Sequence, residues 1–553
     1  MMAITISELI YLSPILILSL AIVILLFLLL LLRVDTKFSA IFAIACLTIA
    51  LLTSVFIGGK IIINDHSLST DPATNQVEQT IQEESESNPY IIPAIPDDSS
   101  IKGLDSNNIS AKESSHLSWQ ASYVTSLFTS DAYGALYTSL ILFLSIVVST
   151  LSLNWFKNDE QQHHGLFYLM VLFSSLGATI LIYSSHLMSL FIGIELLSIP
   201  IIGLIGYQYT QQYSLEAAIK YMVLSVISTT FLLLGIAFYY AATGELTFSG
   251  LSFQLSTVSA PSILLLLGVC LMLVGIGFKL ALVPFQLWLP DVYQGAPACI
   301  ALLLTTVSKV AIFCAVARLF LLAPIVNNET IRIIMVIMAF CSIIWGNVFA
   351  IKQQDIKRLL AYSSITNFGY LLIALIAVQY QVLALETIGI YLIGYILANI
   401  CVLSVISLES KSTETDSKNI NLSGLFWRRP IVALAMGVGL LSLAGAPLTV
   451  GFIGRFSLIL LGVTAELWWL ILAIIIGSAF GLYFYLRLVI NLYIRSPNDN
   501  SAINTQVLQS NQQQKIGINE VFIVGSALLI LLCGIYPRWL FNLVSVAQYL
   551  APN

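Results

Sequence analysis

The chain has 553 residues, of which 58% are hydrophobic and only 9% are charged, with a mean hydropathy of +0.94. Ordinary soluble domains carry about 25% charged residues, so this composition indicates a polytopic helical membrane protein. Ten of the 28 acidic residues lie between Lys60 and His116, so the net charge of −5 reflects one segment and gives no reason to expect a nucleic-acid partner.

Runs of about 20 apolar residues recur along the whole length and predict an all-α fold of about fourteen transmembrane helices. The first run has no basic region before it and no small-residue cleavage site after it, so we interpret it as a retained span. The predicted spans are residues 7–32, 38–59, 131–154, 166–184, 187–207, 215–241, 260–288, 297–322, 330–351, 358–378, 382–407, 430–461, 466–494 and 518–537.

Lysine and arginine follow spans 1, 3, 9, 11 and 13, for example Lys157, Lys352 and Arg495. The short loops after even-numbered spans carry neither residue. Because basic residues concentrate in cytoplasmic loops, both termini are expected on the outside of the membrane.

The predicted regions differ in composition. Residues 61–118 are rich in Ser, Asn, Glu and Asp without an apolar period, which predicts a solvated periplasmic insert, or alternatively a partner-docking loop. Residues 538–551 form an amphipathic tail that could lie along the outer surface. The expected organisation is two spans in 1–60, the insert in 61–118, the third span in 119–165, five-helix units in 166–322 and 330–494, and a cytoplasmic loop, last span and tail in 495–553.

Two spans contain helix breaks. Lys279 precedes Pro284 by five residues, and Pro447 is followed by Gly451, Gly454 and Arg455. Proline removes a backbone donor and clashes with the preceding turn. One break per half, each beside a cation, suggests two inverted five-helix repeats made of spans 4–8 and 9–13, a design common in transporters.

Several charged residues fall within the predicted spans. Glu195 lies mid-span, and Lys220 has Glu216 one helical turn before it, so that these two share a face and could pair. Charges at membrane depth are costly and usually line an ion path. Glu195 is therefore a proton-path candidate, with a structural pairing to a lysine as the alternative. For Lys220 the alternative is snorkelling to the cytoplasmic surface.

Lys279 and Lys309 are the strongest pair of candidates. Lys309 is central in its span, too deep to reach the surface easily. A buried lysine can load and release a proton, whereas an arginine such as Arg455 stays protonated and can only hold a counter-ion or tune its neighbours. Structural pairing is the alternative for both lysines. Arg318 and Arg487 lie toward span ends, and we interpret them as snorkelling residues.

The seven cysteines form no CxxC pair, and none of the five histidines falls mid-span. We therefore expect no disulfide framework, metal site, iron–sulfur cluster or haem in this chain.

The run FKLALVPFQLWLPDVYQGAP at 278–297, the segment around Glu195 and the run SLAGAPLTVGFIGRF at 442–456 resemble the antiporter-like membrane subunits of respiratory complex I, the proton-pumping NADH–quinone oxidoreductase. The details favour its subunit N. The resemblance extends from about span 3 to span 14.

The resemblance implies two inverted five-helix repeats with broken helices 7 and 12, and a half-channel in each repeat. It implies a mid-membrane polar axis, to which Glu195, Lys220, Lys279 and Lys309 correspond. It implies no cofactor in this subunit, because NADH, FMN, iron–sulfur clusters and quinone belong to partner subunits. The implied partners are antiporter-like neighbours, small membrane subunits of the same complex and phospholipids.

The chain departs from the family pattern at three places. Gln286 stands where the family usually has histidine, Arg455 stands where it usually has lysine, and the 61–118 insert is longer than usual. The first two affect the outer half of the expected proton path, where water or Glu466 could replace the missing groups.

The residues and the resemblance together predict a proton-translocating subunit in a bacterial inner membrane, with both termini in the periplasm. It would couple electron transfer from NADH to quinone, in partner subunits, to proton pumping. It would belong to a translocase while carrying no redox centre. One alternative is a subunit of a multisubunit cation/proton antiporter. Another is a structural spacer of the membrane arm whose buried charges only set the helix register.

Overall fold

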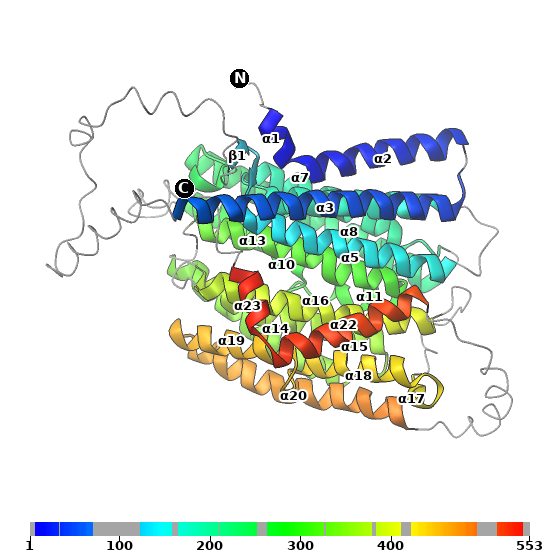
Figure 1. The fold of residues 1–553 in the computed structure, drawn as a ribbon. Helices are drawn as coiled ribbons and strands as arrows, with labels where there is room; N and C mark the ends of the chain where they lie inside the picture. The colour runs from blue at the N-terminus through cyan, green and yellow to red at the C-terminus, as the bar shows by residue number, and fades with distance from the viewer. Residues whose placement is uncertain are drawn as a thin grey trace, which may run out of the picture.

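The computed structural model describes residues 6–32, 34–69, 122–156, 164–209, 211–250, 263–323, 325, 328–378, 383–410, 422–494 and 517–545. Within these ranges, thirteen helices are long and apolar enough to cross a membrane. They lie side by side in one bundle (Figure 1), because a helix satisfies all its backbone hydrogen bonds internally, as the membrane interior requires. The all-α fold class is confirmed.

The N-terminal helices lie at one edge of the bundle (Figure 1). Predicted span 1 is divided into α1 (Ile6–Tyr11) and α2 (Ser13–Leu32), and α3 (Thr36–Ser69) follows. Helix α3 continues nine residues beyond Lys60, into the predicted insert, whereas its membrane-spanning apolar stretch ends at Ile61. The part of the insert after Ser69 lies outside the described residues.

A short antiparallel hairpin, β1 (Ser122–Thr125) and β2 (Phe128–Ser130), precedes the third span and was not predicted. It leads into α5 (Ala132–Trp155), whose N-cap Asp131 accepts a hydrogen bond from the backbone N–H of Gly134 at 2.7 Å. A carboxylate at this position satisfies an otherwise unpaired donor of the first helical turn.

The first predicted repeat begins with three continuous helices and then breaks. The continuous helices are α6 (Gly165–Tyr183), α7 (Leu187–Ile205) and α8 (Gln212–Thr243). The broken part consists of α10 (Ile263–Leu280), α11 (Trp288–Gly295), α12 (Ala298–Leu303), the π-helical turn η2 (Leu304–Ser308) and α13 (Lys309–Leu322).

The second predicted repeat has the same succession of continuous helices and a break. Its helices are α14 (Glu329–Ile351), α15 (Ile356–Ala377), α16 (Leu383–Glu409), the short α17 (Leu425–Arg428), α18 (Pro430–Ala444), α19 (Val450–Thr464) and α20 (Trp468–Tyr493). The predicted span 430–461 is therefore two half-helices, α18 and α19.

Both breaks have a similar backbone feature. The first contains Ala281 at φ +57°, and the second contains Leu448 at φ +70°. Residues other than glycine adopt this left-handed region infrequently, so each position departs from helical geometry at some cost. The two predicted breaks are confirmed, while the inverted relation between the repeats stays a prediction.

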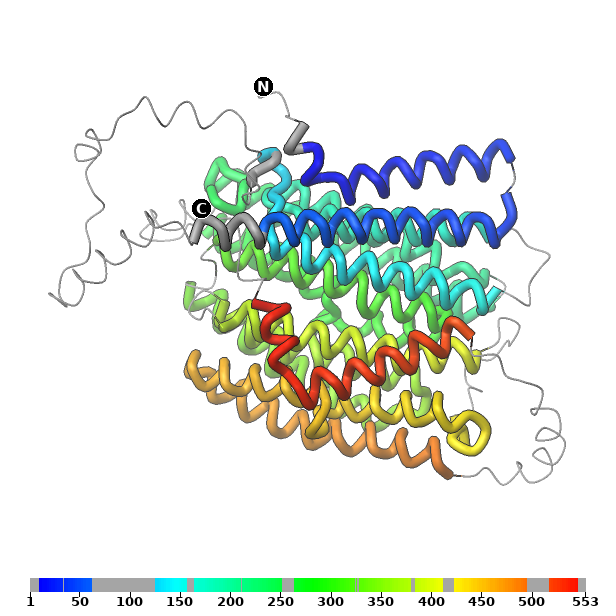
Figure 2. Tube along the Cα trace, in the orientation of Figure 1, coloured from blue at the N-terminus to red at the C-terminus, as the bar shows by residue number. Residues whose placement is uncertain are grey.

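The last two described helices lie across the face of the bundle. The tube in Figure 2 shows α22 (Ile518–Ile535) passing in front of α16 and α18, after which the chain turns into α23 (Arg538–Ser545). On α23, Leu540 and Val544 are buried while Trp539 is exposed. The tail thus forms an amphipathic helix, as predicted, as far as Ser545.

The centre of the bundle is formed by the segment α12–η2–α13 and by α16, whose apolar stretches are completely buried. Close backbone approach helps pack the helices. A Cβ on Gly235 of α8 would lie 2.7 Å from the carbonyl oxygen of Gly268 on α10, so only glycine allows this separation. Small residues at such crossings are typical of membrane helix packing.

Candidate functional site

Lys279 lies one residue before the end of α10 and has an exposed fraction of 3%. Its ammonium group donates to Ser198 Oγ on α7 at 2.8 Å and to Ser225 Oγ on α8 at 2.7 Å. Helix α10 stops directly after it, since Leu282 donates its N–H to the Gly277 carbonyl and the chain turns away. The first break thus places a lysine where three helices meet.

Glu195 lies three residues before Ser198 on α7 and is half-buried. Among the described residues, no cation comes within ion-pair distance of it. It lies close enough to Lys279 and Tyr221 to interact with both electrostatically. The alternative reading of Glu195, a direct ion pair with a lysine, is therefore not observed within the described ranges, and its carboxylate acts on Lys279 only through space.

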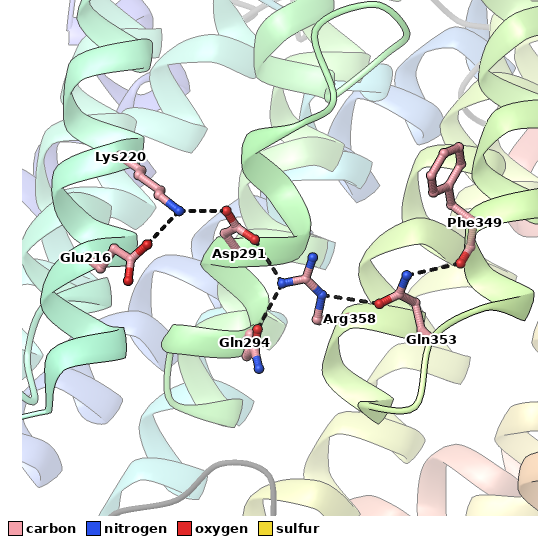
Figure 3. A network of polar contacts seen from close by, with 7 residues as sticks. All are labelled: Glu216, Lys220, Asp291, Gln294, Phe349, Gln353 and Arg358. Carbon is pink, nitrogen blue, oxygen red and sulfur yellow. Dashed lines mark hydrogen bonds and ion pairs between the residues drawn. The ribbon is translucent and has the colours of Figure 1, made fainter.

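Lys220 is found in a different cluster, nearer the start of α8 (Figure 3). Its ammonium group lies 2.7 Å from Glu216, as the one-turn spacing predicted, and 2.9 Å from Asp291 on α11. Its side chain is 44% exposed, so in this chain Lys220 is not a buried relay like Lys279.

Asp291 connects the two predicted repeats. Its other oxygen accepts from Arg358 of α15 at 2.9 Å, and the same Arg358 nitrogen donates to Gln294 at 2.9 Å (Figure 3). The neighbouring Lys357 donates to the carbonyl of Ala296 at 2.9 Å. Side chains of α15 thus hold the short helix α11 at its middle and at its C-terminal end. The sequence showed each charge but not that they form one cluster.

Lys309 is completely buried at the start of α13. It donates to Ser364 Oγ on α15 at 2.7 Å, and its ammonium group lies 5.0 Å from the centre of the Phe368 ring. Ser364 is in turn 2.9 Å from the hydroxyl of Tyr395 on α16. A charged amine over an aromatic face is stabilised by the ring quadrupole. The Ser364 hydroxyl can accept from the charged amine or donate to the neutral one, so the site suits both forms.

The helix that carries Lys309 is irregular directly before it. The turn η2 is π-helical, and within it Thr305 is hydrogen-bonded to Tyr293 of α11. Single π-helical turns occur frequently at functional sites. Here the turn connects α11, which contacts the Lys220 cluster, to the helix that bears Lys309.

Gln286 is buried in the first break with an exposed fraction of 3%. Its Oε1 atom has no hydrogen-bond partner among the described residues. A buried acceptor without a donor is costly, so this position favours a polar ligand or water over an apolar neighbour. The amide replaces the side chain that the resemblance predicts, but it cannot titrate.

Arg455 is 7% exposed and donates to the carbonyl oxygens of Leu443 and Ala444, the last two residues of α18. Its guanidinium carbon lies 5.5 Å from the centre of the Tyr370 ring. A cavity of about 20 Å³ adjoins it, lined by Asn367, Tyr391, Gly394, Tyr395, Ser442, Leu443, Gly451, Gly454 and Arg455. The second break thus carries a buried, permanent cation next to a small polar cavity.

Arg318 corrects one interpretation of the sequence. It is 1% exposed and lies 2.7 Å from the equally buried Asp131. It also donates to Thr129 at 2.5 Å. The interpretation as a snorkelling residue is wrong, because the hairpin β1–β2 and the N-terminus of α5 cover this end of α13 and supply a carboxylate. Arg487 is exposed, as expected.

The structure therefore divides the predicted site residues into four groups. Glu195 and Lys279 lie near one another, Lys220 belongs to the Asp291 cluster, Lys309 has the Ser364–Tyr395 pair, and Arg455 occupies the second break. In the described residues, no hydrogen bond joins Lys279 to Lys309. The hydroxyl partners on other helices were not predicted, since a serine or tyrosine in an apolar span gives little signal by itself.

Known proteins resemble this chain in sequence and in fold. The sequence model of the family described as "NADH:quinone oxidoreductase/Mrp antiporter, TM" matches residues 184–481. This range includes both breaks and all five predicted site residues.

Three solved structures contain a chain of similar fold. A chain of respiratory complex I from Thermus thermophilus is 24% identical, with 97% of this chain and 100% of that chain covered and a TM-score of 0.69. A chain of the membrane-bound sulfane sulfur reductase, an archaeal respiratory membrane complex, is 20% identical. The match covers 98% of this chain and 97% of that chain, with a TM-score of 0.74. A chain of the Mrp complex from Dietzia sp. DQ12-45-1b is 17% identical. The match covers 76% of this chain and 84% of that chain, with a TM-score of 0.64.

Proposed function

Because this chain belongs to the NADH:quinone oxidoreductase/Mrp antiporter family of membrane subunits, we propose that it is a proton-translocating subunit of a respiratory complex I. In this role, electron transfer in partner subunits shifts charge along the membrane arm. Lys279 and Lys309 take up and release protons in response, Glu195 biases the charge of Lys279, and the Lys220–Asp291 cluster connects the two repeats.

One observation carries the proposal. Lys279 and Lys309 are both buried, and neither has a carboxylate within 4.0 Å in the described part of the chain. A lysine that only fixed helix register would be expected in an ion pair, because an uncompensated buried charge is strongly unfavourable. Serine hydroxyls contact both lysines instead, and a hydroxyl can donate to a neutral amine as well as accept from a charged one.

The proposed sequence of events follows from these contacts. A proton on Lys279 is stabilised by Glu195 through space and by Ser198 and Ser225 directly. Among the described residues no carboxylate lies within 4.0 Å of Lys309, and in this proposal its proton passes to the Ser364–Tyr395 pair. Partner subunits would supply NADH oxidation, FMN, iron–sulfur clusters and the quinone site.

The test uses the assembled complex in sealed vesicles. Lys279→Ala and Lys309→Ala should each reduce proton pumping at least tenfold, with Lys352→Ala, at an exposed lysine, as the matched control. Quinone reductase activity and vesicle acidification are measured together. Wild-type values of both in an assembled Lys279→Ala complex would rule out Lys279 as a relay.

Two further outcomes discriminate the alternatives. Co-purification with flavin and iron–sulfur subunits supports a complex I, whereas its absence together with sodium-dependent proton exchange supports a cation/proton antiporter. If the lysine variants prevent assembly but never alter pumping in complexes that do assemble, the chain is a structural spacer.

A further inference from the structure

The second helix break is held together by Arg455. Its two terminal nitrogens donate to the carbonyls of Leu443 and Ala444, at a helix end where carbonyl groups lack intrahelical partners. Gly445 follows at φ +76°, and a Cβ there would lie 2.8 Å from Arg455 Cδ. Glycine is thus favoured by the backbone conformation, and the Arg455 side chain would have to shift to make room for a Cβ.

The charge of Arg455 is only partly compensated. No carboxylate lies within 4.0 Å of it among the residues that the structure describes. The carbonyl end of α18 supplies a partial negative charge of about half a unit, and the Tyr370 ring adds a weak attraction. An arginine does not lose its proton in a protein, so a net positive charge persists at this break.

The cavity beside Arg455 continues the hydrogen-bonded line of Lys309. Tyr395, which ends that line, is one wall of the cavity, and Asn367, Tyr391 and Ser442 are others. The Tyr391 hydroxyl donates to Asn367 at 2.7 Å. A cavity of about 20 Å³ with several polar walls is large enough for one water molecule.

We propose that Arg455 is a fixed electrostatic barrier at the second break: the adjoining cavity admits water but not an excess proton. Protons passed from Lys309 to the Ser364–Tyr395 pair then leave by a route that does not cross this break. A positive charge at a constriction repels protons and cations while neutral water can still enter. A lysine at the same place could discharge and open the path, whereas arginine cannot.

This inference rests on the proposed proton loading of Lys309, but its test needs no turnover. The complex is reconstituted in sealed vesicles without electron donor, an inward pH gradient is imposed, and the rate of internal acidification is recorded. Arg455→Lys should raise the passive proton flux about fivefold or more. The matched control, Arg487→Lys at an exposed arginine, should leave the flux unchanged.

A second variant keeps Arg455 in place. Ser442→Asp adds a carboxylate to the cavity wall and should raise the flux by neutralising the guanidinium. Adding Lys309→Ala to either variant should return the flux to the wild-type rate. Wild-type flux in the complexes that assemble with Arg455→Lys or Ser442→Asp would overturn the barrier. Pumping that is insensitive to Lys279→Ala and Lys309→Ala would instead remove the proposed function.

Discussion

Lys309 on α13 donates a 2.7 Å hydrogen bond to Ser364 Oγ on α15. These residues belong to the two predicted repeats, so the contact crosses the interface between them. Ser364 also contacts Tyr395 at 2.9 Å, and a hydroxyl with partners on both sides can relay a proton by accepting from one and donating to the other.

Ser364→Ala removes this connection without changing the helix backbone. We expect the rate of proton pumping to fall about tenfold or more, since a hydrogen bond to a charged group contributes roughly 1.5–3 kcal/mol. The pumping rate is measured as the acidification of sealed vesicles during electron transfer. Ser457→Ala is the control, because Ser457 donates only to a carbonyl of its own helix. An unchanged pumping rate in Ser364→Ala would exclude the relay.

The buried Arg318–Asp131 pair makes a prediction about stability. Arg318→Met leaves an uncompensated carboxylate under the hairpin, and breaking a buried pair in this way costs roughly 3–5 kcal/mol. The double variant Arg318→Met, Asp131→Ala should recover part of that loss. The loss in the single variant and the recovery in the double variant are both measured by unfolding the purified protein in mild detergent. Additive losses in the double variant would show that the two residues are not coupled.

Asp291→Asn tests whether α15 and α8 hold α11 through this carboxylate. The variant weakens two partly exposed ion pairs at once, so we expect a loss of about 1 kcal/mol in the free energy of unfolding. The loss should shrink at high salt because exposed charges are screened. Glu409→Gln, which removes a single ion pair of 3.6 Å with Arg429, should cost less. An equal cost at all salt concentrations would contradict an electrostatic clamp.

His186 makes the start of α7 sensitive to pH. It lies outside the membrane-spanning helix, and its Nδ1 accepts from the N–H of Met188 at 3.1 Å. Burial lowers the pKa of His186 below its usual value of about 6.5, with Glu245 opposing the shift. The folded state therefore favours the neutral ring. This contribution to stability is present above pH ~6.5 and is lost as the pH falls through the lowered pKa.

His186→Asn provides the comparison, because asparagine caps a helix without titrating. Unfolding temperatures between pH 8 and pH 5 should decline more for the wild type than for His186→Asn below pH ~6.5. Parallel curves would show that the cap does not depend on the charge of His186.

The membrane helices and the two breaks could be predicted because single-residue chemistry determines them. Bilayer thickness sets the length of an apolar run, and Pro284 and Pro447 interrupt helices by removing a backbone donor. The predicted proximity of Glu216 and Lys220 rests on helical spacing alone, and it is confirmed. The membrane orientation remains a prediction.

The partners of the buried lysines could not be predicted. Ser198 is 81 residues from Lys279, and Ser364 is 55 residues from Lys309, so these contacts depend on how the helices pack. Arg318 was misread for the same reason, since its partner Thr129, in the hairpin that buries it, lies 189 residues earlier in the chain. Contacts between distant segments follow from the fold and leave little local signal in composition.

The π-helical turn η2 has a consequence for comparing this chain with its relatives. A π turn accommodates one residue more than an α turn, and each residue of an α-helix corresponds to a rotation of about 100°. Consider a relative that lacks this π turn and is one residue shorter at this place. Its lysine at the aligned position would be rotated by about 100° and would point away from α15. Equivalent residues around Lys309 should therefore be identified by superposition in space, because a gapless alignment across Leu304–Ser308 can be wrong by one position.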